Sequence, residues 1–259
     1  ITDEEFWVAV NYLNELGERK EAALLAAGLG LEHYLDMRAD EKEAAAGTDV
    51  GTPRTIEGPL YVANAPLSEG FARMDDGSEN AETMWLHGSV TDLDGKPVAG
   101  AIVDIWHANT LGGYSFFDPS QSEYNLRRRV KTGADGRYAV RSIVPCGYGC
   151  PPDGPTQKLL TGLGRHGNRP AHVHFFVSAP GFKHLTTQIN LNGDQYLWDD
   201  FAFATREELI ADPVKITDST LARERDINAP HTEVSFNFSL VQAAENAEES
   251  RGKRSRVKE

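Results

Sequence analysis

All 13 prolines of this 259-residue chain lie beyond residue 51, and the first 46 residues contain none. Proline removes a backbone donor and breaks the interior of a helix, so long helices fit best in the proline-free part. Residues 1–46 are also rich in Ala, Leu and Glu, which favour helix. The sequence therefore predicts a helical segment over residues 1–50 and a differently built region beyond it.

The helical segment carries its own start and stop signals. Thr2 followed by Glu5 forms a capping-box pattern, and Gly28 and Gly30 are typical of a helix end. A further helix is expected over residues 32–46, and Phe6, Val10 and Leu13 mark one apolar face. Residues 1–46 hold eleven acidic and four basic side chains, more than half of the chain's net charge of −13. We interpret this excess as a solvated helical face.

Beyond residue 51, short runs rich in β-branched and aromatic residues alternate with Gly/Pro turns, a pattern typical of strands. Turn signals at Asp94-Gly95 and Asp135-Gly136 predict that the first four runs form two hairpins. We expect a mainly β fold, with a β-sandwich domain over residues 51–244 and a disordered tail over residues 245–259. The predicted strands are residues 85–91, 101–108, 124–132, 137–144, 172–178, 185–191 and 232–240.

Composition excludes several classes of protein. The chain has 39 acidic and 26 basic residues, which argues against a nucleic-acid binder. Its longest apolar runs are too short to span a bilayer. Two cysteines cannot form a disulfide framework, so we expect a cytoplasmic protein. The chain begins at Ile1 without a methionine, and we expect that part of the natural N-terminus is missing.

The strongest local signal for chemistry is His172-Val173-His174, which opens a predicted strand. Residues i and i+2 of a strand point to the same face, so both imidazoles would converge on one point. Two neutral imidazoles are half of a typical transition-metal site. The alternative is a pair of strand histidines that face solvent.

The residues alone leave the other half of such a site open. Cys146 and Cys150 would suggest structural zinc if they joined the histidines, although we favour buried or incidental thiols. Tyr114 follows two glycines, and Tyr148 lies between two glycines. Glycine permits backbone conformations that can direct the neighbouring side chain toward a fixed point. A tyrosine is more often a core aromatic, but two phenolates with two imidazoles would suit ferric iron.

Long motifs in a fixed order give a more specific signal. Beyond residue 50 these motifs are TPRTIEGPLYVANAP (52–66), GFARMDDGS (70–78), DIWHANTLGGYSFFDP (104–119), IVPCGYGCPPDGPTQ (143–157), LGRHGNRPAHVHFF (163–176), LTTQIN (185–190) and DDFAFATREEL (199–209). Through them the chain resembles the intradiol ring-cleavage dioxygenases, and within them the catechol-cleaving bacterial members. The N-terminal stretch also resembles the helical linker of that family, through YLNELG (12–17) and GLGLEHYLDMR (28–38).

The resemblance implies one non-heme Fe(III) per subunit and the intradiol cleavage of catechol by O2 to cis,cis-muconate, a reaction of aromatic-compound degradation. It implies that Tyr148 is the axial ligand that leaves the iron when substrate binds, and that Arg169 and Gln188 act beside the reacting substrate. The implied metal ligands are Tyr114, Tyr148, His172 and His174.

The resemblance also implies which residues surround the substrate. Some relatives carry proline where this chain has Ala27, so the pocket is expected to be slightly roomier or more flexible there. Leu60 resembles the catechol enzymes, because chlorocatechol relatives tend to carry an aromatic residue at that position. Hydroxyquinol or chlorocatechol cleavage is the alternative within the family. The implied substrate-binding residues are Leu24, Ala27, Ile56, Pro59, Leu60, Arg169, Phe201 and Ala202.

The family resemblance further implies a homodimer joined through the N-terminal helices, with lipid held between them. From a different class, a non-catalytic β-sandwich binding module would leave Arg169 and the two glycine-framed tyrosines unexplained. We expect structural hydrogen bonding near the site for Asp104 and the Asp199-Asp200 pair, and core or pocket-wall positions for Trp106 and Trp198. His231 is expected at the surface.

Overall fold

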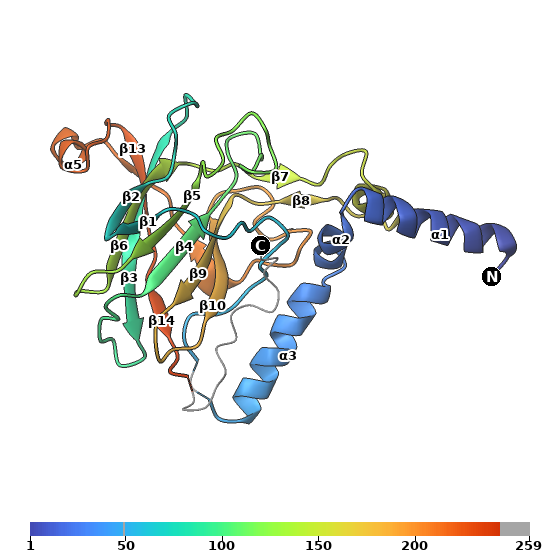
Figure 1. The fold of residues 1–259 in the computed structure, drawn as a ribbon, viewed down its shortest axis with the longest axis horizontal. Helices are drawn as coiled ribbons and strands as arrows, with labels where there is room; N and C mark the ends of the chain where they lie inside the picture. Colours follow the sequence, from blue (N-terminus) through green and yellow to red (C-terminus); the bar gives the residue numbers. More distant parts are fainter. Residues whose placement is uncertain (49, 244–259) are drawn as a thin grey trace.

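The computed structural model describes residues 1–48 and 50–243, and the predicted disordered tail at residues 245–259 lies outside them. Three helices come first, and the regular structure of the remaining described chain is mainly β-strand, which confirms the predicted fold class (Figure 1). No helix among the described residues is both long and apolar enough to cross a membrane.

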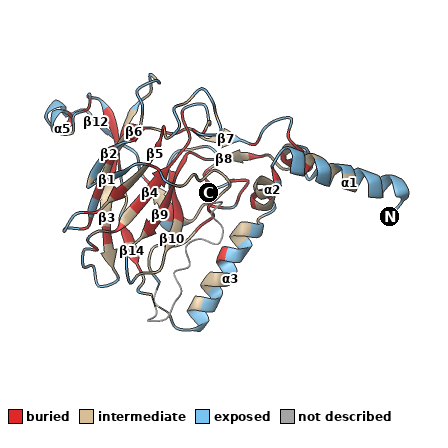
Figure 2. Cartoon of the chain, viewed as in Figure 1, coloured by how far each residue is buried: buried red, intermediate tan, exposed pale blue. Residues whose placement is uncertain are grey.

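The N-terminal segment forms α1 (Asp3–Glu18), α2 (Ala22–Gly28) and α3 (Leu31–Ala45). The capping box predicted at Thr2 and Glu5 is present, with both reciprocal hydrogen bonds. Helix α1 extends away from the sheets and is largely exposed (Figures 1 and 2). Its predicted apolar face is therefore not covered by the rest of this chain, since Phe6 is 52% and Leu13 64% exposed.

Helix α3 is joined to the β-sheet region by ion pairs. Asp40 contacts Arg54 at 3.0 Å and Arg206 at 2.8 Å, and Glu43 accepts from Lys183 at 3.2 Å. The acidic helical segment is thus only partly a solvated face, because these two carboxylates meet cations of the following region.

The first sheet has the order β1-β5-β4-β9-β10-β11. The strand that begins with the two histidines, β9, lies in its centre between β4 and β10. The bounds are β1 (Leu67–Glu69), β4 (Ile102–Trp106), β5 (Arg127–Lys131), β9 (His172–Ser178), β10 (Leu185–Leu191) and β11 (Ile210–Ala211).

The second sheet has the order β12-β13-β3-β6-β2, with β14 also paired to β3. Between the two sheets lies one apolar core, to which β9 contributes Val173, Phe175 and Val177 (Figure 2). The bounds are β2 (Phe71–Arg73), β3 (Thr83–Asp92), β6 (Arg137–Ile143), β12 (Val214–Ile216), β13 (His231–Ser235) and β14 (Phe238–Leu240).

Both predicted hairpins are wrong. Strand β3 pairs with β6, β13 and β14, whereas β4 pairs with β5 and β9 in the other sheet. Likewise β5 and β6, on either side of the Asp135-Gly136 turn, belong to different sheets. A turn signal reports a chain reversal, and it does not distinguish pairing within a sheet from crossing to the opposite sheet.

Shorter elements complete the fold. The strands β7 (Tyr148–Gly149) and β8 (Asn168–Arg169) pair to form a two-stranded ribbon, and α4 (Pro155–Gly162) lies between them in the sequence. A 3₁₀ helix η1 (Glu207–Leu209) and helix α5 (Ser219–Glu224) lie in later loops. The ribbon places Tyr148 opposite Arg169.

Candidate active site

A row of polar side chains crosses the centre of the first sheet. His174 of β9 is paired with Gln188 of β10 and with Trp106 of β4, and His172 is paired with Asn190. Paired residues of neighbouring strands share a face, so these side chains lie opposite the core-facing Val173. The predicted common face of the two histidines is confirmed, and the site lies on the outer side of this sheet.

The two tyrosines reach this row from separate segments. Tyr148 comes from the β7–β8 ribbon, and Tyr114 comes from the loop after β4. Gly112 has φ of +81°, and a Cβ there would lie 2.4 Å from Cβ of Tyr148. Only glycine permits this close approach, which brings the Tyr114 loop against Tyr148.

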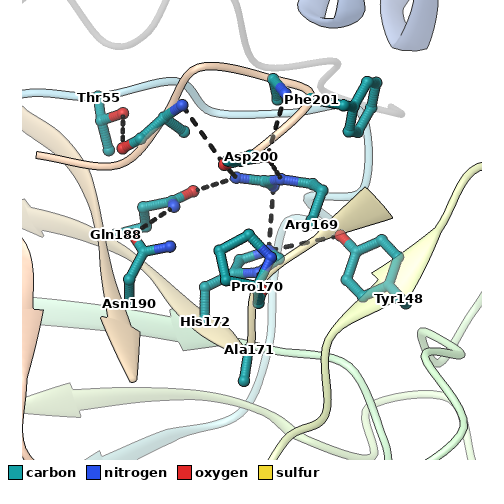
Figure 3. Close-up of polar contacts among 12 residues, drawn as sticks. Thr55, Tyr148, Arg169, Pro170, Ala171, His172, Gln188, Asn190, Asp200 and Phe201 are labelled. Atoms are coloured by element: carbon teal, nitrogen blue, oxygen red, sulfur yellow. Dashed lines mark hydrogen bonds and ion pairs between the residues drawn. The ribbon is translucent and has the colours of Figure 1, made fainter. Parts of the chain in front are cut away.

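The hydroxyl oxygens of the two tyrosines lie close to one nitrogen of His172, and Figure 3 shows the contact between Tyr148 and His172. The hydroxyls of Tyr114 and Tyr148 lie 3.2 Å apart, and each is 3.4 Å from Nε2 of His172. His172 donates its Nδ1 proton to the carbonyl oxygen of Pro170 at 2.6 Å, which leaves the Nε2 lone pair directed at the tyrosines.

His174 completes the group of four. Its ring centroid lies 4.7 Å from that of His172 at an interplanar angle of 84°, and it stacks on Trp106 at 5.0 Å. Nδ1 of His174 is buried and has no hydrogen-bond partner among the described residues. The stacked indole restricts rotation of this imidazole.

The surroundings control the protonation of these groups. Burial, assisted by the nearby Arg169 charge, lowers the pKa of His172 to about 3, and burial also lowers the pKa of His174 well below its usual value. Both imidazoles are therefore neutral at neutral pH and can act as ligands. Burial raises the pKa of Tyr114 and of Tyr148 although the nearby Arg169 acts to lower both, so neither phenol ionises without a further positive charge.

These residues fit a metal ion. Nε2 of His172 lies 3.0–3.4 Å from three polar groups, namely the two tyrosine hydroxyls and Nη1 of Arg169. Its single lone pair can accept a hydrogen bond from only one of them. Donor atoms about 3.3 Å apart match the spacing of ligands around a metal with bonds of about 2.0–2.1 Å. Phenolates are hard anionic donors that suit ferric iron.

Other combinations of ligands are not brought together. Among residues 1–48 and 50–243, no cluster of three or more His, Cys, Asp or Glu side chains could hold a metal. Cys150 packs in an apolar cluster, and Sγ of Cys146 contacts the carbonyl oxygen of Asn109 at 3.6 Å. Neither thiol forms a disulfide, and neither joins His172 and His174 in such a cluster.

Arg169 and Gln188 also lie at this site. Arg169 is buried and contacts Nε2 of His172 at 3.0 Å through Nη1, while its Nη2 donates to Oε1 of Gln188 at 2.8 Å (Figure 3). Asp200 accepts two further hydrogen bonds from the guanidinium. Although burial acts to raise it, Arg169 holds the pKa of Asp200 below its usual value, so the carboxylate stays charged.

The apolar residues expected around the substrate fall into two clusters, and Pro59 lies in neither of them. Ala27, Ile56, Phe201 and Ala202 share a buried cluster against which Leu24 packs. Leu60 packs instead with Tyr114, Tyr148 and Trp106. Pro59 lines a separate cavity of about 250 Å³ between α2 and α3.

Two minor expectations are wrong and one interaction network was missed. Trp198 is 71% exposed and lies in neither core nor pocket wall, and His231 is fully buried. The sequence patterns do not predict the role of Asn190, whose Oδ1 accepts a hydrogen bond from Nε2 of Gln188 at 3.0 Å. Its position two residues after Gln188 in a strand is the signal that could have found it.

Comparisons with known proteins place the chain in a family. The model of the family described as "Dioxygenase" matches residues 56–242, and the one described as "Catechol dioxygenase N terminus" matches residues 1–47. The chain is 58% identical to catechol 1,2-dioxygenase of Acinetobacter guillouiae over 93% of this chain and 80% of the relative.

Structural comparison gives the same result. The wild-type catechol 1,2-dioxygenase of Acinetobacter radioresistens superposes with a TM-score of 0.96 and 56% identity, covering 99% of this chain and 84% of that one. Hydroxyquinol 1,2-dioxygenase of a Rhizobium strain is more distant, at 38% identity over 86% of this chain and 76% of the relative. With matches across both its helical and its β regions, the chain belongs to the intradiol ring-cleavage dioxygenase family.

Proposed function

We propose that this chain is a catechol 1,2-dioxygenase that cleaves catechol between its hydroxyl-bearing carbons with O2 to give cis,cis-muconate. The observation that carries the proposal is the convergence of two phenol hydroxyls and one imidazole nitrogen, 3.2–3.4 Å apart, beside a buried arginine. The higher similarity to catechol enzymes than to a hydroxyquinol enzyme supports this substrate.

The family uses non-heme iron. In this chain Tyr114, Tyr148, His172 and His174 would hold one Fe(III) per subunit, because they supply two hard anionic oxygens and two neutral nitrogens. When bound, the iron would act as a Lewis acid and template that takes both catechol oxygens and makes the ring reactive toward O2.

The two tyrosines have different tasks in this proposal. Tyr114 is 3% exposed and held in a buried cluster, so it is suited to remain a fixed ligand. Tyr148 is half-buried and lies on a two-residue strand, so its side chain is the freer of the two. We assign its Oη as the base that takes a proton from a catechol hydroxyl.

Arg169 and the apolar cluster are proposed to act on the aromatic ring of the substrate. The Arg169 guanidinium is always charged, and its Nη1 faces the donor cluster, where it would stabilise negative charge that develops on the substrate. Gln188 holds the arginine from the far side. Ile56 and Phe201 would orient a flat ring and exclude water, as expected of a mainly apolar pocket.

The assembly is also a proposal. Exposed Phe6, Trp7 and Leu13 on α1 support a homodimer joined through the N-terminal helices. The cavity between α2 and α3, lined by Ala26, Leu31 and Leu35 among others, supports lipid binding between these helices. Two free thiols support a reducing, cytoplasmic setting.

An oxygen-uptake assay with catechol, with muconate absorbance followed in parallel, tests the reaction. Two phenolate ligands predict a broad visible band, and Tyr148→Phe should change that band and abolish turnover. Tyr138→Phe is the matched control, because this tyrosine lies in the core and donates to the carbonyl oxygen of Phe236. Normal turnover by Tyr148→Phe, or a colourless protein with full iron occupancy, would refute the ligand assignment.

Substrate choice is tested separately. Initial rates on catechol, 4-chlorocatechol and hydroxyquinol should rank catechol first. A faster rate on 4-chlorocatechol or hydroxyquinol would identify that compound as the preferred substrate, and the proposed type of reaction would be unchanged.

A further inference from the structure

Asp200 and Arg169 form a buried ion pair with two parallel hydrogen bonds (Figure 3). Nε of Arg169 donates to Oδ1 at 3.2 Å, and Nη2 donates to Oδ2 at 3.1 Å. The side chain of Arg169 is 5% exposed and that of Asp200 is 1% exposed. Such a two-point contact fixes the plane of the guanidinium as well as its position.

The pairing decides which part of the arginine faces the candidate metal cluster. Nε and Nη2 are engaged by Asp200, and Nη2 also donates to Gln188. Nη1 is the nitrogen that remains on the side of His172, at 3.0 Å from its Nε2. If the guanidinium rotated about its own axis, a different nitrogen would take this place.

Asp200 is itself held rigidly. Its Oδ1 accepts from the amide of Ala202 at 3.0 Å, and its Oδ2 lies 3.4 Å from the amide of Ala204. These bonds close the turn that also carries Phe201. The carboxylate is therefore a fixed support, whereas a free arginine side chain has several rotatable bonds.

We propose that Asp200 is a positioning residue that acts through Arg169, directing Nη1 toward the face where catechol reacts. This role rests on the proposed function. The sequence suggested only structural hydrogen bonding for Asp200, and the new element is a contribution to the reaction rate. Residues that orient metal ligands typically contribute 10- to 100-fold to metal affinity or activity, and we expect an effect of about that size for a residue that orients Arg169 beside them.

A double-substitution cycle tests the proposal with Asp200→Asn, Arg169→Met and the double variant, with kcat calculated per bound iron. Asp200→Asn should lower kcat by about 10- to 100-fold with a smaller change in KM. In the Arg169→Met background the same substitution should alter kcat by less than about twofold, because the guanidinium that Asp200 orients is absent. Asp199→Asn is the matched control, because that carboxylate is 80% exposed and pairs with His166.

Melting temperatures of the four iron-free proteins give a second readout. Each single substitution should lower the melting temperature, and the double variant should melt at or above the Arg169→Met protein, whose buried carboxylate has lost its partner. If the double variant lost as much melting temperature as the two single variants together, the coupling between Asp200 and Arg169 would be refuted. A purely structural role predicts lower melting and iron content with unchanged kcat per iron.

The outcomes separate the two proposals. An active wild type with Asp200→Asn within twofold of its kcat overturns the role of Asp200 alone. Equal losses from Asp200→Asn in both backgrounds also overturn it. An inactive, iron-loaded wild type with coupled melting temperatures overturns the proposed function, and the rate contribution of Asp200 with it.

Discussion

The carboxylate of Glu21 accepts a hydrogen bond from the amide of Thr156, 135 residues further along the chain, at 3.0 Å. Thr156 lies in the first turn of α4, and Glu21 is 7% exposed. The side chain thus satisfies an otherwise unpaired amide and places negative charge at the positive end of a helix. Gly154 leaves space for it, because any side chain there would overlap with the carboxylate.

We predict that Glu21→Ala lowers the free energy of unfolding by about 1–2 kcal/mol, since it removes this cap. Glu21→Gln should retain most of the stability, because the amide oxygen still accepts the hydrogen bond. Urea unfolding of the three proteins measures the effect. Glu15→Ala is the control, because its ion pair with Lys158 is near the surface and contributes about 0–1 kcal/mol. Equal losses at Glu15 and Glu21 would contradict this role.

Gly28 sets the position of Phe201. A Cβ at residue 28 would lie 3.0 Å from Cε2 of Phe201, closer than an ordinary contact, so Gly28→Ala should displace the ring within the proposed pocket. We predict that kcat/KM for 4-methylcatechol relative to catechol changes by about tenfold, the range expected for one methyl-sized change in fit.

Gly17→Ala is the matched control for Gly28→Ala. It also lies in a helix, but nothing is within 4 Å of its added Cβ. It should leave the selectivity unchanged and stabilise the helix by about 0.5–1 kcal/mol. An unchanged substrate ratio in Gly28→Ala would show that Phe201 does not define the pocket.

Asp104 predicts a pH dependence of stability. Burial raises its pKa to about 7, although the Tyr61 hydroxyl, which donates to it at 2.8 Å, and nearby Arg129 and Arg127 act in the opposite direction. An unfolded aspartate has a pKa of about 3.9, so the folded state binds the proton more tightly. The stability from this group is complete below about pH 4 and is lost as the pH rises to about 7.

Asp104→Asn should therefore remove part of the loss of stability that wild type shows between pH 5 and pH 7. Urea unfolding across this range measures the difference, which is at most about 2.7 kcal/mol, because one proton changes the free energy of unfolding by at most about 1.36 kcal/mol per pH unit. Asp94→Asn, whose side chain is 77% exposed, should follow the wild-type curve. Parallel curves for Asp104→Asn and wild type would contradict the assignment.

Iron removal should lower the melting temperature. A ligand that binds only the folded state stabilises it by about 2.7 kcal/mol at 100 times its dissociation constant. We predict that the chelated protein melts lower than the iron-loaded one, and that His174→Ala shows a smaller difference. Differential scanning calorimetry measures both. Equal melting of the two wild-type forms, with iron demonstrably bound, would contradict a site within the folded structure.

The errors in the sequence reading share one physical cause. The turns at Asp94-Gly95 and Asp135-Gly136 are local, and their position was predicted from local chemistry. Which strand lies beside β3 depends on how two sheets pack across a common core, and that is not encoded in four residues. Buried His231 and exposed Trp198 are similar cases, because burial depends on which segments cover a residue.

The sequence by itself determined the helical segment, the mainly β class, the family and the common face of His172 and His174, because propensity, period and motif are properties of nearby residues. Only the tertiary structure decided that Tyr114, Tyr148 and His172 meet within 3.4 Å. It also decided that Asp200 holds the guanidinium of Arg169. These contacts join residues up to 58 positions apart, and they exist because the packing of loops and ribbon on the outer face of one sheet brings their ends together.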